Sequence, residues 1–104
     1  MEQTMKTTFK EENNSYVMYF EGRLDTAASV QTEREMAVLN DANGKDIVLD
    51  CSKLNYISSS GLRLFLGLLK TAKPKGSHVY ITGMNDDLRQ VFAMTGFTNL
   101  FEFK

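Results

Sequence analysis

The segment with the clearest chemical potential is Ser58-Ser59-Ser60-Gly61, which stands directly before an apolar run in the stretch YISSSGLRLFLGLLK. A serine hydroxyl at the start of a helix caps the first free backbone N–H groups and contributes about 1 kcal/mol. One serine is enough for a cap, so the other two are free for a second role. Because a helix N-terminus carries a partial positive charge, a phosphoryl group on an exposed serine there would be stabilised.

Phosphorylation of such a serine would add about 1.5 to 2 negative charges to the protein surface. A partner docked flat over the serine would then be displaced, while the domain itself would stay folded. The residues alone leave two interpretations open. The serines either cap a helix and do nothing else, or they also provide a phosphorylation switch.

Other chemistry finds little support in the sequence. The only histidine, His78, begins an expected strand, and no motif places a general base beside the serines. Neither GxGxxG nor GxxxxGK[ST] occurs, which argues against a phosphate cradle. The only cysteine, Cys51, has no partner for an internal disulfide or a zinc site. We therefore expect no catalytic residues, no metal site, no cofactor and no enzymatic activity.

Size and charge narrow the class of protein. The chain has 104 residues, of which 42% are hydrophobic and 24% charged, so we expect a single domain over residues 1–104. The net charge of -1 provides no positive field for nucleic acid or for a membrane surface. No stretch approaches the roughly 18 apolar residues of a membrane span, and the first residues lack a signal peptide's apolar core. We expect a cytoplasmic protein.

The first half of the chain predicts a hairpin, a helix and a strand. Residues 7–11 and 16–21 are β-prone and flank a turn at Asn13-Asn14-Ser15. A helix is expected from Thr26 to about Asn40, capped by Asp25 or Thr26. Residues 46–51 form a short apolar run, which favours a central strand that is covered on both faces.

The second half predicts two more helices around one more strand. The first helix runs from about Ser60 to Thr71, with apolar residues at helical spacing, and a strand follows at residues 78–82. Asn85 can cap the last helix, which should end at a left-handed Gly96 with Phe97 folded back toward Phe92. The order β-β-α-β-α-β-α predicts an α/β fold with parallel strands joined by crossover helices.

Three segments resemble one known family. DCSKLNYISSSGLRLFL, from Asp50, is similar to the signature region of STAS domains of bacterial anti-sigma factor antagonists, in which an Asp-Ser-Ser-Gly turn precedes a helix. FEGRLDTAAS, from Phe20, resembles the family's Gly-x-Leu-Asp segment, and VFAMTGFTNLFEF, from Val91, resembles its last helix and glycine. The resemblance extends over nearly the whole chain. It implies a mixed sheet of four to five strands packed against three helices.

The resemblance also implies a function and a site. The protein would be a non-enzymatic switch, a monomer or weak dimer, that captures an anti-sigma factor, usually a serine kinase with ATP or ADP bound. The kinase would release itself by phosphorylating Ser59, the first serine after the position of the family's aspartate. The implied contact residues lie in two segments: Arg23, Leu24 and Asp25, and Ser58, Ser60, Gly61, Leu62 and Arg63.

Two features depart from the family pattern. Ser58 stands where the family usually has aspartate, and the chain ends at Lys104, whereas many relatives carry a further helix. The first departure supports an alternative hypothesis. In that alternative the domain is a STAS scaffold or a nucleotide-sensing module in a larger assembly, and no kinase acts on its serines.

Overall fold

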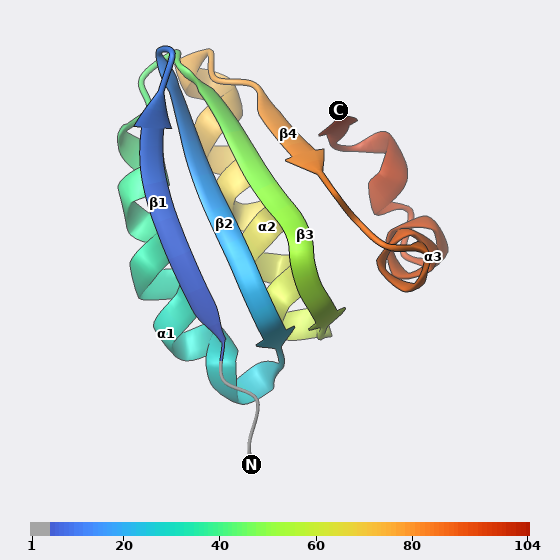
Figure 1. Cartoon of the computed structure of the whole chain (residues 1–104). Coiled ribbons are helices and arrows are strands. Elements are labelled where there is room, and N and C mark those ends of the chain that lie inside the picture. The colour runs from blue at the N-terminus through green and yellow to red at the C-terminus, as the bar shows by residue number, and fades with distance from the viewer. Residues whose placement is uncertain (1–4) are drawn as a thin grey trace.

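A computed structural model describes residues 5–104 and contains one five-stranded sheet (Figure 1). The strands are β1 (Lys6–Glu12), β2 (Ser15–Leu24), β3 (Asp46–Ile57), β4 (Val79–Thr82) and β5 (Glu102–Phe103). Their order across the sheet is the same as their order along the chain. β1 is antiparallel to β2, and the other neighbouring strands are parallel. The expected mixed sheet and its β-β-α-β-α-β-α order are confirmed, and β5 is the fifth strand.

The β1–β2 hairpin closes through a two-residue turn. Glu12 pairs with Ser15, and the residues between them, Asn13 and Asn14, have φ angles of 49° and 64°. Two consecutive left-handed residues are characteristic of a tight turn whose twist matches that of the strands, and asparagine tolerates this conformation well. The predicted hairpin is therefore confirmed.

Helices α1 (Thr26–Met36) and α2 (Ser59–Ala72) lie side by side on one face of the sheet, while α3 (Asp86–Met94) lies beyond β4 (Figure 1). The predicted first helix is shorter than expected, because the chain changes to a 3-10 helix at Ala37–Asp41. Asp25 caps α1 by accepting a hydrogen bond from the Ala28 N–H at 2.8 Å. Asn85 caps α3 in the same way, as predicted, with the Leu88 N–H at 2.9 Å.

The prediction for β3 was wrong in two respects. The strand continues six residues past Cys51, to Ile57. The pairing of β2 with β3 shifts twice, between Tyr19 and Glu21 and between Gly22 and Arg23, and each shift leaves one extra residue on β3. These bulges interrupt the two-residue alternation that identifies a strand in a sequence. The second error concerns burial. The strand is central, as predicted, but only one of its faces is fully covered, since Val48 is half-exposed.

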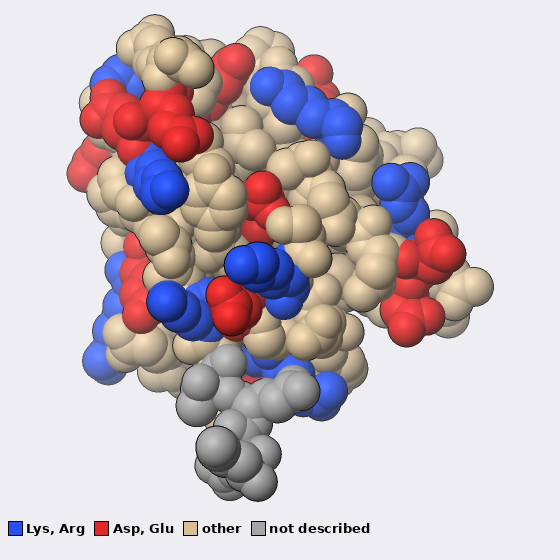
Figure 2. All heavy atoms as spheres, in the orientation of Figure 1, with Lys and Arg blue, Asp and Glu red and all other residues tan. Residues whose placement is uncertain are grey.

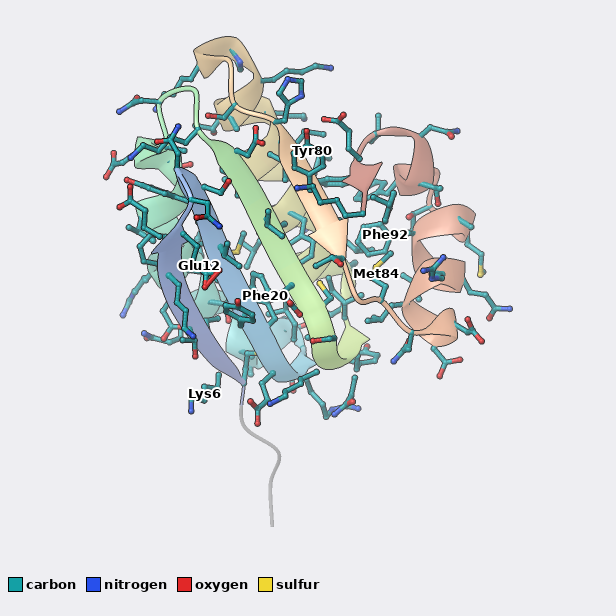
Figure 3. All side chains as sticks on the ribbon, turned by 45° about the horizontal axis from the view of Figure 1, so that its top comes forward. Lys6, Glu12, Phe20, Tyr80, Met84 and Phe92 are labelled. Atoms are coloured by element: carbon teal, nitrogen blue, oxygen red, sulfur yellow. The ribbon has the colours of Figure 1, made fainter. Side chains whose placement is uncertain are left out.

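Aromatic side chains connect three elements of the core, β2, α2 and α3. The ring of Phe65 on α2 lies 5.2 Å from that of Phe20 on β2 and 6.4 Å from that of Phe92 on α3, measured between centroids. Figure 3 shows Phe20 and Phe92 on these two separate elements. Phe97 packs against Phe92 at 6.2 Å, after Gly96 has ended the helix with a φ of 79°. The predicted stop of the last helix is confirmed.

No helix within residues 5–104 covers the other face of the sheet. Figure 2 shows this face, on which basic and acidic side chains are interspersed without a large patch of one sign. Near it, Lys10 lies over the ring of Tyr19 and Lys104 over that of Tyr80. None of the helices in residues 5–104 is long and apolar enough to cross a membrane.

Candidate functional site

The two segments expected to carry the site lie next to each other at one edge of the sheet. β2 and β3 are parallel, and at their carboxyl ends Arg23 pairs with Tyr56 and Leu24 with Ile57. Each strand is followed after one residue by a helix, so the starts of α1 and α2 also lie at this edge. The Ser58 N–H donates a hydrogen bond to the Leu24 carbonyl oxygen at 2.9 Å, which joins the two segments directly.

Ser58 is the N-cap of α2. Its backbone is extended, and its Oγ accepts a hydrogen bond from the Gly61 N–H at 3.2 Å. The residue is only 8% exposed, so the hydroxyl is used inside the structure. Its carbonyl oxygen accepts the first backbone hydrogen bond of the helix, from the Leu62 N–H at 2.9 Å. Ser58 therefore performs the capping role for which one serine is enough.

Ser59 is the first residue of α2, and it is exposed. The free N–H groups and the dipole of a 14-residue helix favour negative charge at this position. The first turn of α2 contains no acidic residue that would repel an added anion. Ser60 follows and is half-exposed. The cap and the accessible hydroxyl are thus two different serines.

Gly61 allows the start of α2 to lie directly on the strand ends. A Cβ on this residue would come within 2.8 Å of Ile57 Cγ1 and 2.8 Å of Leu24 Cγ. Atoms at such a distance overlap, so any larger residue would force the helix or the side chains of Ile57 and Leu24 to shift. The glycine fixes the position of the serines relative to the end of β2.

An aromatic residue that the sequence analysis did not select also lies at this edge. Tyr56 is 40% exposed, and the guanidinium of Arg23 lies 4.3 Å from the centroid of its ring. The attraction between a cation and an aromatic face holds the arginine in place. Tyr56 was missed because the expected strand ended at Cys51. A regular continuation of the strand would have placed Leu54 opposite Arg23, and it is the two bulges that bring Tyr56 there.

The residues expected at the contact surface fall into two groups. Arg23, Ser59 and Arg63 are exposed, and Asp25 and Ser60 are half-exposed, so these five can meet a partner. The other four are buried and hold the site together from inside: Leu24, Ser58, Gly61 and Leu62. No group of three potential metal-binding side chains occurs within residues 5–104.

Comparison with known proteins identifies the same architecture. The family model for the STAS domain matches residues 6–104. A Bordetella bronchiseptica protein with the provisional name anti-sigma factor antagonist BtrV is 30% identical over 97 residues, covering 93% of this chain and 84% of the relative. The anti-sigma-B factor antagonist of Listeria monocytogenes is 24% identical over 96 residues, covering 91% of this chain and 84% of the relative.

Solved structures with the same fold include both states of one regulator. The unphosphorylated form of the anti-sigma factor antagonist SpoIIAA superimposes with a TM-score of 0.73 at 18% identity, covering 95% of this chain and 87% of that one. The phosphorylated form of SpoIIAA from Bacillus gives a TM-score of 0.71, covering 95% and 91%. An anti-sigma factor antagonist from Mycobacterium paratuberculosis gives 0.81 at 19% identity, covering 96% and 85%.

Proposed function

The chain belongs to the STAS domain family, and from this premise we propose that it is an anti-sigma factor antagonist. In this function it binds an anti-sigma factor and thereby frees a sigma factor for transcription. Two curated relatives bear the name of that function. The protein acts by binding and not by catalysis, and it acts in the cytoplasm, where sigma factors work.

Phosphorylation of Ser59 controls this binding in our proposal. The observation that supports it is that the two serines differ: Ser58 is buried and caps α2, whereas Ser59 beside it is exposed. A phosphoryl group on Ser59 needs no rearrangement of the cap. It places a dianion in the middle of a surface formed by Arg23, Asp25, Ser60 and Arg63, and an anti-sigma factor docked there is expelled.

The kinase in this scheme is the anti-sigma factor itself, which holds ATP before the transfer and ADP after it. The γ-phosphoryl group passes from ATP to the Ser59 hydroxyl, whose proton is released. Because Ser58 replaces the aspartate of the family pattern, the acceptor has no carboxylate immediately before it. The kinase that recognises this chain therefore needs no basic group opposite residue 58.

The test uses the purified anti-sigma factor kinase from the same genome. Incubation with ATP should add one phosphate to the wild-type chain, and mass spectrometry should locate it on Ser59. The Ser59→Ala variant should remain unmodified, whereas Ser60→Ala, its matched control, should accept the phosphate. Phosphate on another residue, with Ser59→Ala fully competent, contradicts the proposed switch.

A second candidate function is supported by one observation. Ser58, which stands where the family pattern has aspartate, carries no charge and is fully engaged as a cap. The serines could then serve only to begin the helix, with no kinase acting on them. The domain would in that case serve as a scaffold or nucleotide-sensing module in a larger assembly. A Ser59→Asp variant separates the two candidates: the switch predicts a clear loss of affinity for the anti-sigma factor, and the scaffold predicts unchanged assembly.

A further inference from the structure

A groove between α1 and α2 extends the surface around Ser59. It has a volume of about 310 Å³, and its floor is apolar, formed by Met36, Leu64 and Leu68. Glu33 on α1 and Arg63 on α2 also line it. Within residues 5–104 neither of these two charged side chains takes part in an ion pair. The groove thus has an apolar floor, and Asn40, Thr71, one carboxylate and one guanidinium line its sides.

This groove is continuous with the phosphoacceptor. Ser59, Arg63, Gly67 and Thr71 follow each other at four-residue steps, which places them in one row along α2. All four are exposed, and the last three line the groove. A partner that covers Ser59 and continues along α2 therefore meets the groove next.

Gly67 forms a notch in this row. It lies inside α2, where glycine is less favourable than alanine because it has more conformational freedom to lose. A Cβ on this residue would meet no atom within 4 Å, so no packing inside the chain requires the absence of a side chain. Gly61, in the same helix, has such a requirement. The missing side chain at Gly67 leaves space only for something outside the chain.

We propose that the α1–α2 groove is the second half of the anti-sigma factor docking surface and that the Gly67 notch receives an apolar side chain of that partner. The proposal rests on the proposed function. The partner segment carries an acidic group toward Arg63 and a basic group toward Glu33, on either side of the apolar one. These three features define the chemistry of the segment that fits the groove.

The test fills the notch and measures stability and binding separately. Gly67→Ala should raise the Tm by about 2–8 °C, because it removes the cost of glycine in a helix without a clash. Gly67→Leu should fold equally well and bind the purified anti-sigma factor kinase about tenfold more weakly or worse. Gln90→Leu adds the same side chain to the exposed face of α3 and should leave affinity unchanged.

Three outcomes overturn the proposal, and they differ from one another. If Gly67→Leu binds with wild-type affinity while Ser59→Asp loses affinity, the notch has no role in docking and the proposed function still holds. No binding by the wild-type chain removes both. A wild-type dimer in sedimentation that Gly67→Leu dissociates would show that a second copy of this chain occupies the groove.

Discussion

The backbone N–H of Ser58 donates to the carbonyl oxygen of Leu24 at 2.9 Å, and this single bond connects the end of β2 to the start of α2. Residues 34 positions apart in the chain are thereby held side by side at one edge of the sheet. Together with the pairing of Leu24 with Ile57, it places the exposed neighbours Arg23 and Ser59 at the same end of the two strands. The arrangement of the exposed surface therefore depends on two buried residues, Leu24 and Ser58.

The Ser58→Ala variant should lose stability, whereas Ser59→Ala should not. Removing the Ser58 hydroxyl leaves the Gly61 N–H without its acceptor at a buried position, and loss of a helix cap costs about 1 kcal/mol. Ser59 is exposed and caps nothing, so its removal should stay within about 0.5 kcal/mol. Urea denaturation of both variants measures the difference, and equal midpoints would contradict the assignment of the cap.

Gly61→Ala should be destabilising, although alanine is the better helix former. The new methyl group would overlap Ile57 and Leu24 at 2.8 Å, and overpacking of this kind costs about 1–3 kcal/mol. Thermal unfolding compared with the wild type provides the measurement. A stabilised Gly61→Ala protein would mean that α2 can move away from the strand ends without cost.

Ser59→Asp should affect stability and binding in opposite directions. A carboxylate in the first turn of α2 interacts favourably with the helix dipole, which stabilises the fold by about 0.3–1 kcal/mol. The same charge should weaken the complex with the anti-sigma factor by about 1–3 kcal/mol, since it lies in the docked surface. Chemical denaturation and calorimetric titration give the two values. A destabilised variant would show that the start of α2 does not accept an anion.

Tyr56→Ala should weaken partner binding about three- to tenfold with little change in stability. The tyrosine is 40% exposed and holds the Arg23 guanidinium over its ring at 4.3 Å. Without the ring, Arg23 has more rotamers to lose when a partner binds. Arg23→Ala and the double variant complete a thermodynamic cycle. Additive losses of affinity would mean that the two side chains act independently.

Stability should fall in alkaline solution because of Cys51. Burial is the main cause that raises the pKa of this thiol to about 12, and the nearby Asp50 adds to the shift. In the unfolded chain the thiol ionises near pH 8.5. The folded state keeps its proton longer, so this contribution to stability is complete below about pH 8.5 and is lost as the pH rises toward 12. The slope approaches about 1.4 kcal/mol per pH unit.

The Cys51→Ala variant isolates this effect from other groups that titrate in the same range. Its free energy of unfolding should fall less steeply than that of the wild type between about pH 9 and 11. Urea denaturation at a series of pH values provides the comparison. Parallel curves for the two proteins would assign the alkaline loss of stability to other residues.

The sequence predicted those parts of the fold that depend on local signals. The Asn13-Asn14 turn, the cap at Asn85 and the stop at Gly96 follow from the conformational preferences of single residues, and all are present. For the first helix the sequence left the cap open between Asp25 and Thr26, and the structure selects Asp25. The bulges in β3 arise from its pairing with β2, which no local pattern records. They hid the second half of the strand, and with it the position of Tyr56.

The candidate site was predictable in its location but not in its division of roles. The motif around Ser59 places the serines at a helix start, and a helix follows them at that point. Which serine caps the helix depends on how deeply each is buried against Leu24, and that is a property of the packed structure. The groove at Gly67 likewise requires the neighbouring helix to be in place before the empty space is visible.

The order of the strands has a consequence for synthesis on the ribosome. Each strand of the sheet pairs with the one translated immediately before it, so every new strand has a partner that has already been made, although its own outer edge stays open until the next strand follows. Sheet edges that lack a partner are prone to aggregate in partly made chains. In this chain, each newly emerged strand finds its docking edge already formed, and the nascent protein can grow outward from the hairpin one strand at a time.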